Sequence, residues 1–159
     1  MQLRAISLLG LAASLSAAPA LSAAPADAAT CPRGTLTGQV TLVRDGDTIV
    51  VGSMPIRLNG LAAPEGDEPG GAAATNTMEQ MVLGRELRCE LDGERTHDRC
   101  VGVCYLDGTD ISEVMVHRGV ARDCPRFSQG RYAEAELRAA ADGATIREEY
   151  MLPGFCRPG

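Results

Sequence analysis

The chain is poor in aromatic side chains, with no tryptophan, three tyrosines and two phenylalanines among its 159 residues. Proteins that bind single-stranded nucleic acids usually stack bases on exposed aromatic rings. The composition therefore offers little material for such a surface. Lysine is also missing, so all 15 basic side chains are arginines. We assign no function to this absence, which fits a bias in the base composition of the gene.

Basic residues are outnumbered by acidic ones, and the formal net charge is −6. Removing residues 1–29 takes away one arginine, Arg4, and one acid, Asp27, so the net charge of the remainder is unchanged. Non-specific affinity for nucleic acids comes largely from basic side chains that neutralise phosphates. The charge therefore argues against a broad basic surface. Phosphate contacts would have to come from a few arginines, whose planar forks suit phosphate oxygens.

The sequence lacks the ligand spacing of a structural zinc site. No two cysteines form a CxxC pair, and His97 and His117 have no paired-ligand spacing. Six cysteines in a small exported domain indicate three disulfide bonds instead, for which fifteen pairings are open in principle. Two of them, Cys89 and Cys104, lie in β-rich runs that a polar segment joins, and the last two would hold the C-terminal segment. The expected pairs are Cys89–Cys104, Cys124–Cys156 and, by elimination only, Cys31–Cys100.

Residues 1–29 are typical of a secretory signal peptide. Arg4 precedes a segment of alanine, leucine and serine that runs to about residue 21, and Ala-Asp-Ala at residues 26–28 is a small-x-small cleavage site. An uncleaved helix is the alternative, but no later segment approaches the length of a membrane span. We therefore expect a secreted or periplasmic protein without membrane contact after cleavage. Residues 30–159 are predicted to form a single domain.

Residues 43–65, VRDGDTIVVGSMPIRLNGLAAPE, organise the rest of the chain. Two apolar runs flank Gly52-Ser53, and a two-residue connection of this kind is typical of a tight β-hairpin. Counting back from the turn pairs Val51 with Met54 and Thr48 with Arg57.

This register brings Asp47, Arg57 and Glu65 to the open end of the hairpin. Alternate side chains of a flat strand point to opposite faces, so the gathering requires a bend or bulge at Gly46. The sequence therefore predicts a phosphate site with a cation at this end.

The remaining periodicity indicates an α+β protein, namely a five-stranded OB-type β-barrel with about three helices. Asp110 or Ser112 is expected to cap the second helix, and Ser128 to start the third. The expected strands are residues 39–44, 49–51, 55–58, 86–91 and 100–106, and the expected helices are residues 72–83, a short one ending at Arg118, and 131–142.

The order of these motifs resembles that of the thermonuclease (staphylococcal nuclease-like) family. The sequence DGDT precedes an apolar hairpin that ends in Arg57, and Pro-Glu follows, with Glu65 eight residues after Arg57. In a second motif, DRCVGVCYLDG, Arg99 stands nine residues before Gly108, as an arginine does in the family. The resemblance covers about residues 38–143 and is weaker beyond Cys124. It implies an OB-type barrel that hydrolyses phosphodiesters of DNA and RNA with calcium.

The resemblance implies three catalytic residues, Arg57, Glu65 and Arg99. The two arginines match those that bind the scissile phosphate, and they would hold it more tightly as charge builds up in the transition state. The carboxylate matches the residue proposed as general base, which takes a proton from the attacking water.

The resemblance also implies a calcium site formed by Asp47, Thr48 and Ala63. Asp47 matches a carboxylate ligand, Thr48 could offer a hydroxyl, and Ala63 would use its backbone carbonyl. Calcium accepts oxygen ligands in irregular geometry.

Several positions depart from the family pattern. Ala62 stands where the family has an aspartate. The difference removes a second carboxylate ligand and predicts weak calcium binding. Ala62→Asp is expected to restore the ligand and to tighten calcium binding. Asp67 and Glu68 are alternative donors. His97 and Pro125 occupy positions of tyrosines, one of which contacts the nucleotide.

Two functions from different classes follow. The favoured one is a calcium-dependent phosphodiesterase with low sequence specificity that acts on DNA and RNA, preferably single-stranded, as a monomer. The alternative is a barrel of the same fold that has lost efficient catalysis and serves as an extracytoplasmic binding module, because a fold alone does not determine function.

Overall fold

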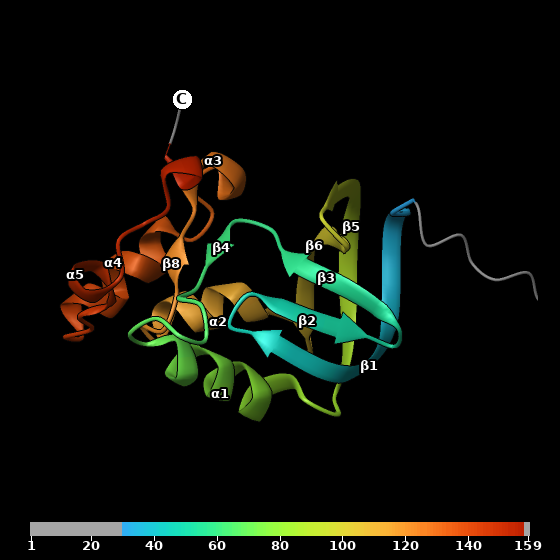
Figure 1. The fold of residues 1–159 in the computed structure, drawn as a ribbon, viewed down its shortest axis with the longest axis horizontal. Coiled ribbons are helices and arrows are strands. Elements are labelled where there is room, and N and C mark those ends of the chain that lie inside the picture. The colour runs from blue at the N-terminus through green and yellow to red at the C-terminus, as the bar shows by residue number, and fades with distance from the viewer. Residues whose placement is uncertain (1–29, 158–159) are drawn as a thin grey trace, which may run out of the picture.

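A closed barrel dominates the computed structural model, which describes residues 30–157 (Figure 1). The strands β1 (Arg33–Asp45), β2 (Thr48–Val51) and β3 (Met54–Leu58) form a meander, and β5 (Glu86–Thr96) and β6 (Arg99–Leu106) form a second hairpin. The first half of β1 pairs with β5 and its second half with β2. Parallel pairing of β3 with β6 closes the barrel. The predicted five-stranded OB-type α+β fold is confirmed.

The predicted hairpin is confirmed in its register. Thr48 pairs with Arg57 and Val51 with Met54. Gly52 has a φ of 62°, which an L side chain rarely adopts and which a tight two-residue turn requires.

Three helices have seven or more residues among those described: α1 (Gly71–Val82), α2 (Ile111–His117) and α4 (Ala133–Ala141). They lie close to the predicted helices, and Asp110 caps α2 by accepting hydrogen bonds from the backbone N–H groups of Ser112 and Glu113. Short elements, which are too brief to show periodicity, were not predicted. These are β4 (Leu61–Ala62), β7 (Thr109–Asp110), β8 (Arg122–Asp123), α3 (Pro125–Ser128), α5 (Ile146–Glu149) and the 3-10 helix η1 (Gly154–Cys156).

The predicted start of the last helix at Ser128 is wrong, because the chain forms two helices there. Gln129 and Gly130 have φ values of 55° and 79°, so both leave the right-handed helical region. The helix α3 ends at Ser128, and α4 begins only at Ala133.

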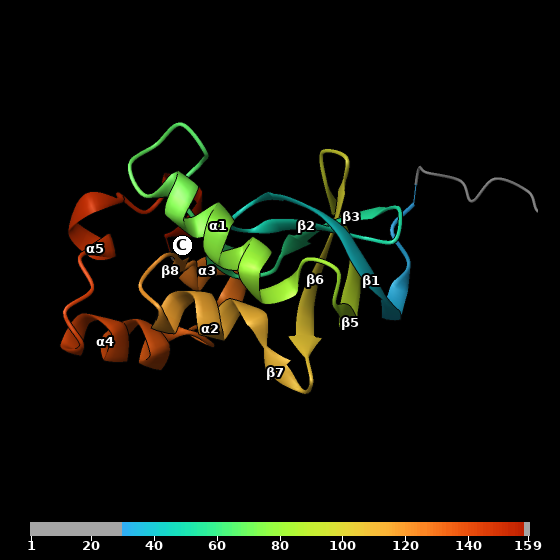
Figure 2. The same ribbon diagram turned by 90° about the horizontal axis from the view of Figure 1, so that it is seen from below.

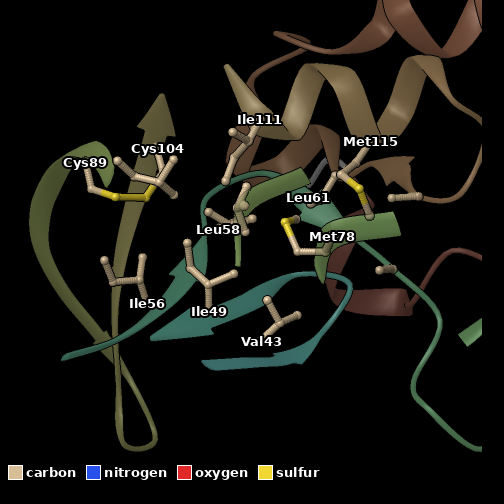
Figure 3. Close-up of a cluster of buried hydrophobic side chains, with 14 of the residues drawn as sticks. Val43, Ile49, Ile56, Leu58, Leu61, Met78, Cys89, Cys104, Ile111 and Met115 are labelled. Atoms are coloured by element: carbon tan, nitrogen blue, oxygen red, sulfur yellow. A yellow bond between two sulfur atoms is a disulfide. The ribbon is translucent and has the colours of Figure 1, made fainter. Parts of the chain in front are cut away.

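The core lies between the barrel and the helices α1 and α2. The helix α1 packs against β1 and lies below the strands in Figure 1 and in front of them in Figure 2. Figure 3 shows Met78 of α1 and Met115 of α2 together with Ile49 and Leu58 of the barrel, and all four are fully buried. This core fixes the ends of β2 and β3, where the candidate site lies.

All three expected disulfides are present, and the described residues contain no free cysteine. One bond joins a residue just before β1 to β6, one joins directly opposed residues of β5 and β6 (Figure 3), and one joins the residue before α3 to η1. The pairs are Cys31–Cys100, Cys89–Cys104 and Cys124–Cys156.

The predicted signal peptide, residues 1–29, lies outside the described residues. Within residues 30–157, no helix is long and apolar enough to cross a membrane.

Candidate active site

The site is built on the turn Gly46-Asp47, which joins β1 to β2. The predicted irregularity is present, because the ladder between β1 and β2 shifts register immediately before Asp45. The backbone N–H of Asp47 donates to Oδ1 of Asp45 at 2.9 Å. A Cβ atom at Gly46 would lie 2.6 Å from that of Ala63 and 2.7 Å from that of Ala74. Only glycine therefore lets the turn sit between α1 and the segment after β4, which directs Asp47 inward.

The carboxylate of Asp47 is buried and is held by several contacts within the protein. The side chain of Arg57 forms an ion pair with Oδ2 at 2.8 Å, and the backbone N–H of Ala63 donates to the same oxygen at 3.2 Å. The hydroxyl of Thr48 donates to Oδ1 at 3.1 Å. The structure thus brings together the predicted residues Asp47, Thr48, Ala63 and Arg57.

Arg99 joins this cluster through Thr48. Its Nη1 donates to Oγ1 of Thr48 at 3.0 Å, and the hydroxyl of Thr48 in turn donates to Asp47. Asp47 therefore positions both arginines, Arg57 directly and Arg99 through one hydroxyl. The Nε of Arg99 is buried and has no hydrogen-bond partner among the described residues. A buried donor without a partner is costly, so this N–H suits an anion that enters the site.

Arg57, Glu65 and Arg99 line one cleft of about 760 Å³. Its size lies within the range of small-molecule binding sites in proteins, roughly 300–1,000 Å³. Glu65 is exposed on the loop after β4, and its backbone N–H donates to Oε2 of Glu68 at 2.8 Å, which orders the loop. All three predicted catalytic residues therefore line the same space.

Two aromatic residues in the cleft were missed by the sequence analysis. Phe127 and Phe155 line the cleft, and their side chains are 48% and 55% exposed. Their ring centroids lie 6.4 Å apart with the planes tilted by 56°. The Cys124–Cys156 disulfide joins the segments that carry them. A signal existed, because the only two phenylalanines each lie within three residues of one of these paired cysteines.

A third missed residue is Tyr150, which packs in a small apolar cluster with Ala62, Cys124, Ile146 and Cys156. Burial raises the pKa of its phenol to about 12, with further contributions from negative charges that include Glu68 and Asp47. The phenol is therefore neutral at physiological pH. No sequence signal pointed to it, because only the tertiary path of the C-terminal segment brings it to Ala62.

Burial raises the pKa of Asp47 to about 7, although the neighbouring charge of Arg57 acts in the opposite direction. Burial also raises the pKa of Asp110 and of Asp123. A carboxyl group with a raised pKa binds a proton more tightly in the folded protein than in the unfolded chain. These groups therefore link folding stability to pH.

Stability is expected to fall as the pH rises from about 4 to about 7, since in this window the folded protein binds more protons than the unfolded chain. The amide introduced by Asp47→Asn cannot ionise, so the free energy of unfolding of this variant should depend less on pH. Urea denaturation at about pH 4.5 and about pH 7.5 measures the free energy of unfolding of both proteins. An equal change in the free energy of unfolding between the two pH values, in wild type and in Asp47→Asn, would show that Asp47 does not contribute to the pH dependence.

The donor set does not fit the calcium ion that the resemblance implies. Calcium takes about six to eight oxygen ligands, whereas both carboxylate oxygens of Asp47 already accept hydrogen bonds from the protein. Ala62 is 1% exposed and offers only a methyl group. Within residues 30–157, no three Asp, Glu, His or Cys side chains form a group that could hold a metal ion. The mechanism proposed below therefore uses side chains of the protein and no metal ion.

A closed OB-type barrel with two arginines and a carboxylate in one cleft defines a nuclease-like class of protein. The profile of the family described as "Staphylococcal nuclease homologue" matches residues 55–148, which contain all three of these side chains. This match covers more than half of the chain. The protein therefore belongs to the family of staphylococcal nuclease homologues, as the resemblance predicted.

The chain is also similar to several individual proteins, some of which are named as nucleases. The chain is 32% identical over 123 residues to "Succinoglycan biosynthesis protein ExoI" of Rhizobium meliloti (strain 1021), which covers 70% of this chain and 64% of that protein. It is 36% identical over 84 residues to "Probable staphylococcal-like nuclease CAN1" of Oryza sativa subsp. japonica, covering 53% of this chain and 25% of that protein. An "Uncharacterized endonuclease" of Haemophilus influenzae is 27% identical over 121 residues, or 72% and 68% of the two chains. The chain thus spans less than two thirds of the first two relatives.

Proposed function

We propose that the protein is a phosphodiesterase that hydrolyses DNA and RNA with low sequence specificity. One observation carries the proposal: Asp47 positions Arg57 and Arg99 in the cleft that Glu65 also lines. Two arginine forks near a carboxylate suit the hydrolysis of an anionic ester, because developing negative charge and the attacking water each have a partner. The relatives named as nuclease and endonuclease support the same chemistry.

In this mechanism the two arginines hold the non-bridging oxygens of the phosphate. The Nε–H of Arg99, which has no partner among the described residues, is available to donate to one of them. Glu65 accepts a proton from water as the water oxygen attacks phosphorus. The bond from phosphorus to the leaving oxygen breaks, and the leaving oxygen keeps the electron pair and takes a proton from solvent. The arginines stabilise the transition state more than the ground state, because its phosphate oxygens carry more charge.

Single-stranded DNA or RNA is the proposed substrate. A base can stack on Phe127 or Phe155 only when it is unstacked from its neighbours, as in a single strand. The side chains lining the cleft include acids such as Asp92 and Glu94 as well as arginines. Stacking therefore adds affinity that the net charge of the protein does not supply.

A secreted or periplasmic location is proposed as well. Three disulfides persist mainly in oxidising compartments. The signal-like N-terminus supports export, and we propose that the protein acts there as a monomer.

The proposed function predicts cleavage of a labelled single-stranded oligonucleotide by the purified protein, at a higher rate than the same sequence as a duplex. Arg99→Ala protein, purified in the same way, serves as the control for contaminating nuclease. Product length by gel electrophoresis measures cleavage. Intact substrate in all reactions, with oligonucleotide binding still detected, would favour the alternative of a binding module, for which the missing carboxylate at Ala62 is the supporting observation.

A further inference from the structure

The C-terminal segment packs against Ala62, whose neighbour Ala63 donates its backbone N–H to Asp47. Ala62 and Tyr150 share an apolar cluster, in which they are 1% and 8% exposed. The loop after β4 and the helix α5, which directly precedes Tyr150, lie at the same end of the molecule in both views (Figures 1 and 2).

Polar contacts of Arg122, on the strand that pairs with β4, hold this placement. Ala62 of β4 pairs with Arg122 of β8, and Nη1 of Arg122 donates to the backbone carbonyl of Tyr150 at 3.2 Å. The Nε of Arg122 also forms an ion pair with Glu136 at 2.8 Å, in which both side chains are largely buried. The Cys124–Cys156 disulfide restrains the same segment. The side chain of Tyr150 is therefore held in place in the cluster that contains Ala62.

The phenol also lies close to the charged groups of the site. Glu68, Asp47 and Glu65 disfavour its ionisation and Arg57 favours it, so all four charges act on the ring hydroxyl. The neutral ring and the methyl group of Ala62 thus occupy the side of the site where a second carboxylate would be needed.

We propose that this site binds a phosphodiester without a calcium ion: Ala62 and Tyr150 close the position that a cation would require, and Asp47 serves to hold Arg57 and Arg99 for the phosphate. Ion pairing and hydrogen bonding commit both oxygens of Asp47 to this task. The two guanidinium groups then supply the positive charge that a cation would otherwise bring. The phosphate part of the inference rests on the proposed function, whereas the closure of the cation position does not.

Thermal unfolding with and without calcium tests the closure directly. A site with a dissociation constant of about 0.1 mM would raise Tm by roughly 8–10 °C at about 10 mM calcium. We expect the wild-type protein to shift by less than about 1 °C. A shift of the larger size in wild type that Asp47→Asn abolishes would overturn the inference. An equal shift in both proteins would place the ion elsewhere and leave the inference standing.

The variant Ala62→Asp tests whether the apolar cluster closes the space at position 62. The added carboxylate would enter the apolar cluster against Tyr150, so we expect a lower Tm in the absence of calcium and no gain in calcium response. Ala62→Asn is the matched control, because asparagine has nearly the size of aspartate and carries no charge. A calcium-dependent rise of roughly 8–10 °C in Ala62→Asp, with its Tm otherwise unchanged, would show that the position is open and would contradict the inference.

Binding of a nuclease-resistant single-stranded phosphorothioate oligonucleotide separates the two proposals. Fluorescence anisotropy measures its dissociation constant in calcium and in chelator. We expect values that agree within about twofold in the two conditions, and a rise of about five- to tenfold for Arg99→Ala. Binding that is detected in calcium but not in chelator would overturn the inference but not the proposed function. Absence of binding in both conditions would overturn the proposed function, while the calcium response of Tm would still decide the closure.

Discussion

Arg99→Ala is expected to lower kcat on a single-stranded oligonucleotide by about 10²-fold or more, with a much smaller change in KM. The Nε of Arg99 has no hydrogen-bond partner within residues 30–157, and in the proposed mechanism the guanidinium binds the phosphate most strongly when charge builds up on its oxygens. Glu65→Gln should have an effect of similar size, because the amide cannot accept the proton of the attacking water. Initial rates over a range of substrate concentrations measure both constants.

The choice of Arg99 over Arg57 makes this result interpretable. Arg57→Ala would also leave the buried carboxylate of Asp47 without its ion pair, so lost activity would mix catalysis with folding. Arg138→Ala is the matched control, because Arg138 lies half-exposed on α4 and does not line the cleft. Equal rates in wild type, Arg99→Ala and Glu65→Gln would mean that another site or a contaminant performs the cleavage.

Removal of the Cys31–Cys100 disulfide by a double Cys→Ser substitution is expected to lower the free energy of unfolding by about 4 kcal/mol. The bond spans 69 residues of sequence, so it restricts the unfolded chain strongly. Removal of Cys89–Cys104, which spans only 15 residues, should cost about 3 kcal/mol. Urea denaturation of the three proteins measures these differences.

Neither disulfide lines the cleft, so the variants that still fold should keep their cleavage rate at low temperature. The order of the two costs is the sharper test. If the bond with the shorter span costs more, the packing of the cysteines in the folded barrel outweighs the restriction of the unfolded chain. The Cys124–Cys156 bond is a different case, because it also holds the segments that carry Phe127 and Phe155.

Local sequence was enough to predict the hairpin, its register and the residues that face each other across its two strands. Gly52-Ser53 allows only a tight turn, and the count from this turn places Thr48 opposite Arg57. The Cys89–Cys104 pair followed from similar reasoning, because the two residues lie in consecutive strands, whereas Cys31–Cys100 followed by elimination only. Local sequence carries this information, since a turn and a strand alternation are decided within about ten residues.

The tertiary structure alone decided which distant side chains complete the site. Phe127 and Phe155 meet at the cleft because a disulfide and two short helices bring their segments together. Tyr150 reaches Ala62 because the C-terminal segment packs against β4 and β8. These contacts depend on how whole elements pack, and elements of two to four residues have no periodicity from which their position could be read. The burial of Asp47 also depends on tertiary packing, because α1 and the segment after β4 close around the turn that Gly46 makes possible.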